Sequence, residues 1–227
     1  LTCAPYHLPT RPTLNENIAW AESNAVTFAN SVLGARTNMS YQYLDLFAAL
    51  TGRMPEYGLY LPKNRAGQIH CDLQGLPHHW LSTDAFFPLL GYVLGRNCKD
   101  RVPVITGLPA STSEDQLRAL SAAASSAGCV PLFHAVGITP EAETLNAAFA
   151  SKPIQDTLLI TAAKILQARS ELNTNVESRT KLGAICLGAP HFSVTEFRHL
   201  LTLLRGRSIA KGITFLISTS RHNYRQL

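Results

Sequence analysis

Residues 102–133 read VPVITGLPASTSEDQLRALSAAASSAGCVPLF, and this stretch decides the fold. It opens with the apolar run 102–106, which is typical of a buried strand. An amphipathic helix follows, with Ser113 placed as its N-cap and Gly128 just beyond its end. A second apolar run begins at residue 130. Strand, helix and strand in this order predict parallel strands joined by a crossover helix.

The same alternation continues to residue 227, and Ser193 and Glu196 have the spacing of a capping box. This pattern indicates an α/β fold with parallel sheets covered by helices on both faces. The first hundred residues are less regular. We expect an N-terminal part, 1–100, and a regular βα-repeating part, 101–227, that stops inside a starting helix. Expected strands are 69–73, 102–106, 130–137, 156–161, 183–188 and 213–219, and expected helices are 16–33, 40–51, 83–94, 113–127, 139–150, 161–172 and 193–206.

The composition is that of an ordinary folded protein, with 46% apolar and 15% charged residues, which argues against disorder. The net charge is +5. A solvated basic surface, an anionic small substrate and nucleic acid are all compatible with this excess. It is dispersed along the chain, and its densest cluster consists of Arg198, Arg205, Arg207, Lys211, Arg221 and Arg225.

The chain has five cysteines, an odd number, and no two have a CxxC spacing. This pattern excludes a disulfide framework and a zinc ribbon, and it predicts a reducing, cytoplasmic location. Any one of the cysteines can also be a buried small hydrophobe. No run of 18 apolar residues exists, so the sequence predicts no membrane span. The five are Cys3, Cys71, Cys98, Cys129 and Cys186.

The stretch 16–38, ENIAWAESNAVTFANSVLGARTN, has an unusual helical pattern. At 100° per residue, a polar stripe falls on one side of small and apolar residues. Gly34 is placed to end the helix. Such a helix could face a ligand, or it could be an alanine-rich buried helix whose hydroxyls bond its own carbonyls. The stripe consists of Ser23, Thr27, Asn30 and Ser31.

Seven blocks of this sequence resemble successive blocks of the aconitase X family, in family order. The resemblance covers essentially the whole chain and implies an aconitase-like fold, a dehydratase activity and an iron–sulfur cluster, either 2Fe-2S or 4Fe-4S. The chain begins without methionine and resembles a fragment of the large, cluster-bearing part of such an enzyme. The blocks are TCAPY, AWAESNAV, ANSVLGARTN, TGRMPEYGLYL, VGITPEAET, LGAPHFSVTEF and STSRHNY.

The resemblance places a cluster ligand at Cys3, where Pro5 disfavours helix and leaves the thiol on a loop. In the archaeal branch a second block resembles Gly-Cys-Pro-His, whereas this chain has alanine at position 189. Cys186 could substitute for the missing ligand, or it could be a core thiol. A third family cysteine would lie beyond residue 227.

The resemblance also implies active-site roles in the blocks that contain Glu22 and Ser23, which we expect to be catalytic. Arg36, Thr37 and Asn38 are expected to bind substrate. The Arg36 fork suits a carboxylate, although it could equally interact with a helix C-terminus.

His191 and Arg221 follow two of the expected strands, at the sheet edge where ligands of α/β proteins bind, and we expect both to contact substrate. A lone histidine at such a position is more often structural. His70, His78 and His79 have no recognised metal-ligand spacing, and we expect them to be surface or packing residues.

These observations predict a hydro-lyase that acts on a small anionic hydroxy acid. Ala189 and the AESN block favour cis-3-hydroxy-L-proline, dehydrated to 1-pyrroline-2-carboxylate, over mevalonate 5-phosphate. The family's catalytic base belongs to a swivel domain or small subunit without a matching segment here, so we expect the fragment alone to be inactive. A non-catalytic, truncated iron–sulfur or RNA-binding relative is the alternative. The sequence shows no basic groove interleaved with aromatic residues, which makes nucleic acid an improbable partner.

Overall fold

The computed structural model describes residues 3–40, 43–174 and 181–227. The chain forms two compact units. The larger unit is Pro12–Leu172, and the smaller unit combines Leu1–Arg11 with Asn173–Leu227. This division differs from the one expected at residue 100. Strand β1, which precedes that position, pairs with two strands that follow it, so the two parts share one sheet.

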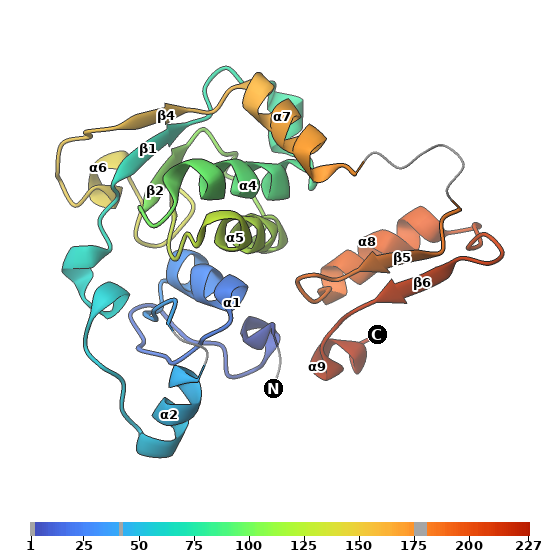
Figure 1. Cartoon of the computed structure of the whole chain (residues 1–227), viewed down its shortest axis with the longest axis horizontal. Helices are drawn as coiled ribbons and strands as arrows, with labels where there is room; N and C mark the ends of the chain where they lie inside the picture. The colour runs from blue at the N-terminus through green and yellow to red at the C-terminus, as the bar shows by residue number, and fades with distance from the viewer. Residues whose placement is uncertain (1–2, 41–42, 175–180) are drawn as a thin grey trace. The chain divides into compact units, whose positions relative to one another are not determined.

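A parallel sheet forms the centre of the larger unit, as the alternating pattern predicts (Figure 1). Its described strands have the order β3-β2-β1-β4. In the register of β1 and β2, Cys71 lies opposite Ile105. The strands are shorter than the expected apolar runs: β1 (Ile69–Asp72), β2 (Pro103–Thr106), β3 (His134–Ala135) and β4 (Thr157–Leu159).

Helices α4 (Phe86–Cys98), α5 (Glu114–Gly128) and α7 (Ala162–Leu172) contribute with Cys71 and Ile105 to the main hydrophobic core. Val104, the neighbour of Ile105, belongs to a second cluster that includes Ala148 of α6 (Leu145–Ala148). Because neighbouring residues of a strand face opposite sides, the two clusters lie on the two faces of the sheet. The α/β class is therefore confirmed.

Helices α4 and α5 pack unusually closely because glycines face each other. A Cβ added at Gly91, Gly95 or Gly128 would collide with the facing helix. Gly91 is therefore a contact residue and not a defect. Pro88 is the third residue of α4, where a helix needs no N–H donor, so it is tolerated.

The expected helix 16–33 is shorter than its pattern suggests. Helix α1 (Ser23–Phe28) is followed by a π-helical turn, Ala29–Leu33, and Gly34 ends it with φ +66°. Residues before Glu22 are not helical, because Asn17 pairs with Arg36 in a parallel bridge.

The next helix begins later than expected, since α2 spans Leu44–Thr51 and residues 41–42 lie outside the described part. Its apolar side chains Phe47 and Leu50 are exposed. Three short helices follow, with bounds Gly58–Tyr60, Pro62–Asn64 and, for α3, His78–Leu81.

The helix expected at 139–150 is wrong over most of its length. The Thr139 hydroxyl, expected as a cap, instead bonds the backbone of Ala135. A one-turn helix, α6, starts only after Thr144, whose hydroxyl caps it. The turn between these residues carries Glu141 to the buried Arg65.

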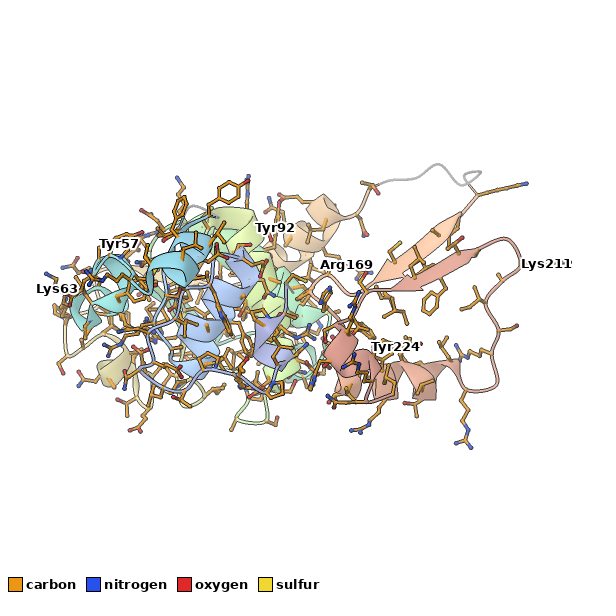
Figure 2. All side chains as sticks on the ribbon, turned by 90° about the horizontal axis from the view of Figure 1, so that it is seen from below. Tyr57, Lys63, Tyr92, Arg169, Lys211 and Tyr224 are labelled. Atoms are coloured by element: carbon orange, nitrogen blue, oxygen red, sulfur yellow. The ribbon has the colours of Figure 1, made fainter. Side chains whose placement is uncertain are left out.

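The smaller unit contains a two-stranded parallel sheet with one helix after each strand. Its elements are Pro5–His7, a 3-10 helix, β5 (Ala184–Leu187), α8 (Val194–Leu204), β6 (Thr214–Ile217) and α9 (Arg221–Tyr224). The capping box of Ser193 and Glu196 is confirmed at the start of α8. The basic cluster found in the sequence lies here on exposed positions, and Lys211 projects from the turn before β6 (Figure 2).

A buried polar cluster joins distant segments of the larger unit. The Arg65 side chain, 3% exposed, bonds the Glu141 carboxylate, Asn30 and the Leu59 carbonyl. The carbonyl of Arg65 accepts a 2.7 Å hydrogen bond from His134 Nε2. A carbonyl only accepts, so this nitrogen carries the proton of a neutral imidazole.

We expect the larger unit to lose stability on acidification because of His134. Burial lowers the pKa of this imidazole below its usual 6.5. Between pH 6.5 and the lower folded-state pKa, the unfolded chain binds a proton that the folded chain does not. The free energy of unfolding therefore decreases as the pH is lowered through this range. Urea unfolding of the wild type and of His134→Gln at several pH values checks this. The variant should show a weaker decline, and the exposed His199→Gln should behave as wild type.

Candidate functional site

Three residues of the polar stripe in α1 and the π-helical turn hold the protein together. Thr27 donates to the carbonyl of Val130 at 2.7 Å, and the Asn30 amide donates to the carbonyl of Pro131 at 2.9 Å. The Ser31 hydroxyl accepts from the backbone of Phe133. These side chains are buried and have partners in the chain. The buried-helix alternative therefore describes Thr27, Asn30 and Ser31, whereas the fourth residue of the stripe, Ser23, is half-buried and its role stays a prediction.

Two expected substrate-binding residues, Thr37 and Asn38, are also buried and bonded to the chain. The Thr37 hydroxyl exchanges hydrogen bonds with the backbone of Trp20. The Asn38 side chain donates to the carbonyl of Tyr57 and accepts from the backbone of Leu59. Both side chains shape the segment that carries Arg36.

Arg36, another expected binding residue, retains unused bonding capacity on its side chain. Its Nη2 donates to Asn15 Oδ1 at 2.8 Å. Its Nε is buried and has no acceptor within the described residues. Asn15 has φ +65°, a conformation that asparagine tolerates better than most residues, and its N–H bonds the carbonyl of Gly34. Asn15 thus orients one side of the Arg36 fork.

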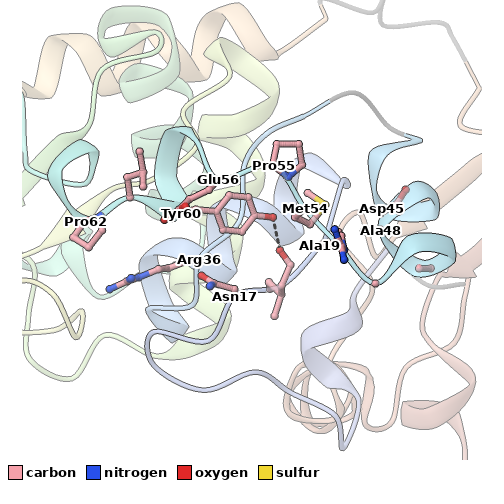
Figure 3. A pocket seen from close by; sticks show the side chains of 15 residues that line it. Asn17, Ala19, Arg36, Asp45, Ala48, Met54, Pro55, Glu56, Tyr60 and Pro62 are labelled. Carbon is pink, nitrogen blue, oxygen red and sulfur yellow. Dashed lines mark hydrogen bonds between the residues drawn. The ribbon is translucent and has the colours of Figure 1, made fainter.

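Arg36 lines a pocket of about 720 Å³ in the larger unit (Figure 3). One wall is α2, and Tyr60 closes another by donating to the carbonyl of Ile18 at 2.7 Å. Burial raises the pKa of Tyr60. The charged side chains of the lining are two cations and two anions, namely Arg36, Arg53, Asp45 and Glu56.

Glu22 and Ser23, expected to be catalytic, lie outside this pocket lining. The Glu22 carboxylate caps α1 by accepting from the backbone of Asn24 and Ala25. This capping accounts for an acidic residue at the start of the helix. A catalytic role of either side chain stays a prediction.

In the smaller unit the N-terminal segment meets the two strand ends. Asn223 Nδ2 donates to His7 Nδ1 and to the carbonyl of Phe192, each at 3.0 Å. His191 precedes Phe192, and Arg221 is the first residue of α9. These contacts bring the segment containing Cys3 to the edge of the sheet that carries His191 and Arg221.

The two proposed cluster ligands are both exposed but lie on different elements. Cys3 is on the N-terminal segment, and Cys186 is within β5. Among the described residues, no group of three histidine, cysteine or acidic side chains is arranged to hold a metal ion. The residues present therefore do not by themselves fit an iron–sulfur cluster, and no reaction step is assigned to one.

Sequence reasoning missed Asn15, Tyr60 and Glu56 as possible contributors to the site. Glu56 and Tyr60 could have been found from the sequence, because both lie in the block TGRMPEYGLYL that resembles the family. Asn15 had no such signal, because its contact with Arg36 spans 21 positions.

The sequence of the chain matches known protein families and individual proteins. Residues 1–63 match the family model of the aconitase X first domain, and residues 67–170 match that of the second domain. Cis-3-hydroxy-L-proline dehydratase of Hypocrea jecorina is 40% identical over 224 residues, which cover 98% of this chain. The enzyme of that name from Pseudomonas aeruginosa is 41% identical over 97% of this chain.

Two archaeal proteins are also similar. The phosphomevalonate dehydratase large subunit of Methanothermobacter thermautotrophicus is 39% identical over 90% of this chain and 48% of its own length. The crystal structure of Thermococcus kodakaraensis aconitase X in its holo-form superposes with a TM-score of 0.87 at 31% identity, covering 99% of this chain.

This chain spans 37% of the length of the two hydroxyproline dehydratases and 55% of the solved aconitase X chain.

Within the described residues, no helix is both long and apolar enough to cross a membrane. The matched domains follow one another along the chain in the order first and second, as the sequence blocks had indicated. The chain belongs to the aconitase X family.

Proposed function

We propose that this chain is part of a hydro-lyase that removes water from cis-3-hydroxy-L-proline to give 1-pyrroline-2-carboxylate. The observation that carries the proposal is Arg36, whose buried Nε has no acceptor in the described chain while its side chain lines the large pocket. A substrate carboxylate in the pocket would pair with the Arg36 guanidinium through a charge-assisted hydrogen bond. The two relatives of that name, at 40% and 41% identity, support the reaction class.

The charges of the pocket favour hydroxyproline over mevalonate 5-phosphate. Its lining has two arginines and two carboxylates, so its formal charges cancel. Hydroxyproline carries one carboxylate and one ammonium group, which such a lining can pair. A phosphate ester with an added carboxylate would meet Asp45 and Glu56 as repelling charges. Ala189, in place of the cysteine of the archaeal block, agrees with this choice.

The proposal includes a partner and a cofactor outside the described pocket. Elimination of water needs a base for the proton next to the carboxylate and an acid for the leaving hydroxyl. Relatives of this chain are named large subunits, which supports a small subunit or swivel segment that supplies the base. The same proposal includes a cytoplasmic location and an iron–sulfur cluster whose ligand set is completed outside this chain, because the described residues do not hold one by themselves.

Arg36→Lys, introduced into the complete enzyme that contains this chain, tests the proposal. Lysine keeps the charge but loses the planar fork, so kcat/KM with cis-3-hydroxy-L-proline should fall by roughly 1–3 kcal/mol of transition-state stabilisation. Asn15→Asp should retain the acceptor for Arg36, whereas Asn15→Gly keeps the backbone and loses the acceptor. We expect activity to decrease in the order wild type, Asn15→Asp, Asn15→Gly, Arg36→Lys.

The exposed Arg207→Lys in the smaller unit is the matched control and should not change the kinetics. Both candidate substrates should be assayed with each protein. An unchanged kcat/KM for Arg36→Lys would reject the binding role. Turnover of mevalonate 5-phosphate in preference to hydroxyproline would reject the proposed substrate.

A further inference from the structure

Two cysteines of the larger unit lie in contact inside the main core. Sγ of Cys71 is 3.8 Å from Sγ of Cys98, and both side chains are buried. Cys71 lies in β1, and Cys98 is the last residue of α4. The other three cysteines, Cys3, Cys129 and Cys186, are exposed. The pair therefore differs from every other thiol of the chain in both burial and proximity to a second sulfur.

The two thiols differ in how an oxidant can reach them. Cys71 lies on the central strand, which is paired on one side with β2 and on the other with β4. Cys98 ends a helix, and its neighbours Asn97 and Lys99 are exposed. Helix ends open locally at a lower free energy than central strands do. Cys98 is therefore the thiol that solvent reaches first.

The surroundings also divide the chemical roles of the pair. The hydrogen bond with Cys98 is the main cause that raises the pKa of the Cys71 thiol, and burial acts in the same direction. The hydrogen bond from Cys71 lowers the pKa of Cys98, and the nearby Arg101 guanidinium acts in the same direction. A thiolate is the reactive form of cysteine, so Cys98 is the nucleophile and Cys71 holds the proton.

We propose that Cys71 and Cys98 form an intramolecular disulfide when a hydroperoxide oxidises the folded chain. The Cys98 thiolate attacks the peroxide, whose O–O bond breaks, and Cys98 becomes a sulfenic acid while an alkoxide or hydroxide leaves. Cys71 sulfur then attacks the Cys98 sulfur, the S–O bond breaks, and water leaves with the Cys71 proton. Two electrons pass from the two thiols to the peroxide.

The cross-link requires the two sulfurs to approach from 3.8 Å to a bonding distance of about 2.05 Å. Cys98 is the residue that moves, because the chain turns immediately after it at Lys99, with φ +56°. The disulfide would join residues 27 positions apart. It should restrict the unfolded chain and raise the thermal midpoint of the larger unit by roughly 5–10 °C.

The test treats the native 227-residue chain with hydrogen peroxide, blocks free thiols in acid, digests the protein and maps the peptides by mass. We expect one peptide pair joined through Cys71 and Cys98, with a loss of about 2 Da from two hydrogens. Exposed Cys129 should carry the blocking group or an added oxygen. Dithiothreitol should remove the cross-link and the gain in thermal midpoint. Cys129→Ala should give the same cross-link, and Cys98→Ala should abolish it while Cys71 stays reduced.

Peptide mapping of the wild type gives the answer even if a core variant fails to fold. Sulfinic acid at Cys98 without a cross-link would overturn the proposal. Cross-links in which Cys71 or Cys98 pairs with another cysteine would also overturn it. None of these outcomes depends on the substrate of the enzyme, so the proposed function is tested separately.

Discussion

Replacing Arg65 by alanine is expected to destabilise the larger unit by at most about 3–5 kcal/mol, the cost of breaking a buried ion pair, because Arg65 is buried whereas Glu141 is 26% exposed. The guanidinium is 3% exposed and bonds Glu141 through Nε and Nη2. Its Nη1 donates to Asn30 Oδ1 and the Leu59 carbonyl, and Nη2 also donates to the Asn30 carbonyl.

All three guanidinium nitrogens of Arg65 have acceptors, which an alanine side chain would leave without their donor. Lysine would not repair the loss, because one ammonium group cannot reproduce a planar fork. The free energy of unfolding of Arg65→Lys should therefore lie between those of the wild type and Arg65→Ala. The segments that would separate are the π-helical turn with Asn30 and the turn with Glu141. Arg36 lies six residues after Asn30, so its pocket should loosen with them.

Urea unfolding curves of the wild type, both Arg65 variants and Arg101→Ala measure this effect. Arg101 pairs with Asp156 at the surface, with side chains 40% and 52% exposed. Its loss should cost at most about 1 kcal/mol. Equal midpoints for Arg65→Ala and Arg101→Ala would show that the buried cluster does not stabilise the fold as argued.

Local patterns predicted the parallel sheet and several of its helices correctly. Apolar runs such as 102–106 and caps such as Ser193 act over a few residues, so one sequence contains the whole signal. The predicted helix 139–150 was too long, because a residue within it makes a polar contact outside the helix. Thr139 looked like a helix cap, but its hydroxyl bonds Ala135 instead. Such a competition between two local hydrogen bonds is decided by the tertiary structure.

The candidate site was less predictable because its contacts are distant in sequence. Thr27 bonds Val130, 103 positions away, and Arg65 bonds Glu141, 76 positions away. A polar stripe that faces a ligand and one that faces backbone carbonyls have the same period. Arg36, expected to bind substrate, lines the pocket, and its binding role stays a prediction, whereas its neighbours Thr37 and Asn38 have structural contacts.

We further expect the 227-residue chain alone to be inactive as a dehydratase. Its kcat/KM should be lower than that of the complete enzyme by a factor of about 10²–10⁴ or more. This factor is the usual contribution of a positioned acid or base, and the proposal places the base in a partner segment. The chain spans 37% of the hydroxyproline dehydratases it resembles.

The smaller unit gives a structural reason for the same expectation. Among the described strands, β5 and β6 pair only with each other, so each has an open edge. Cys186 and Leu216 lie opposite each other in this sheet, and both are exposed. Parallel sheets are normally buried on both faces, which agrees with the proposal that a partner segment completes the enzyme.

The experiment assays the chain with cis-3-hydroxy-L-proline alone and after mixing with the remaining part of the Pseudomonas aeruginosa relative, supplied as a separate polypeptide. Activity should appear only in the mixture, and Arg36→Lys should reduce it as in the complete enzyme. Turnover by the isolated chain at the rate of the complete relative would mean that the 227 residues already contain both the acid and the base. Asp45 and Glu56, the carboxylates of the pocket, would then become the candidates for the base, since they face the volume that Arg36 lines.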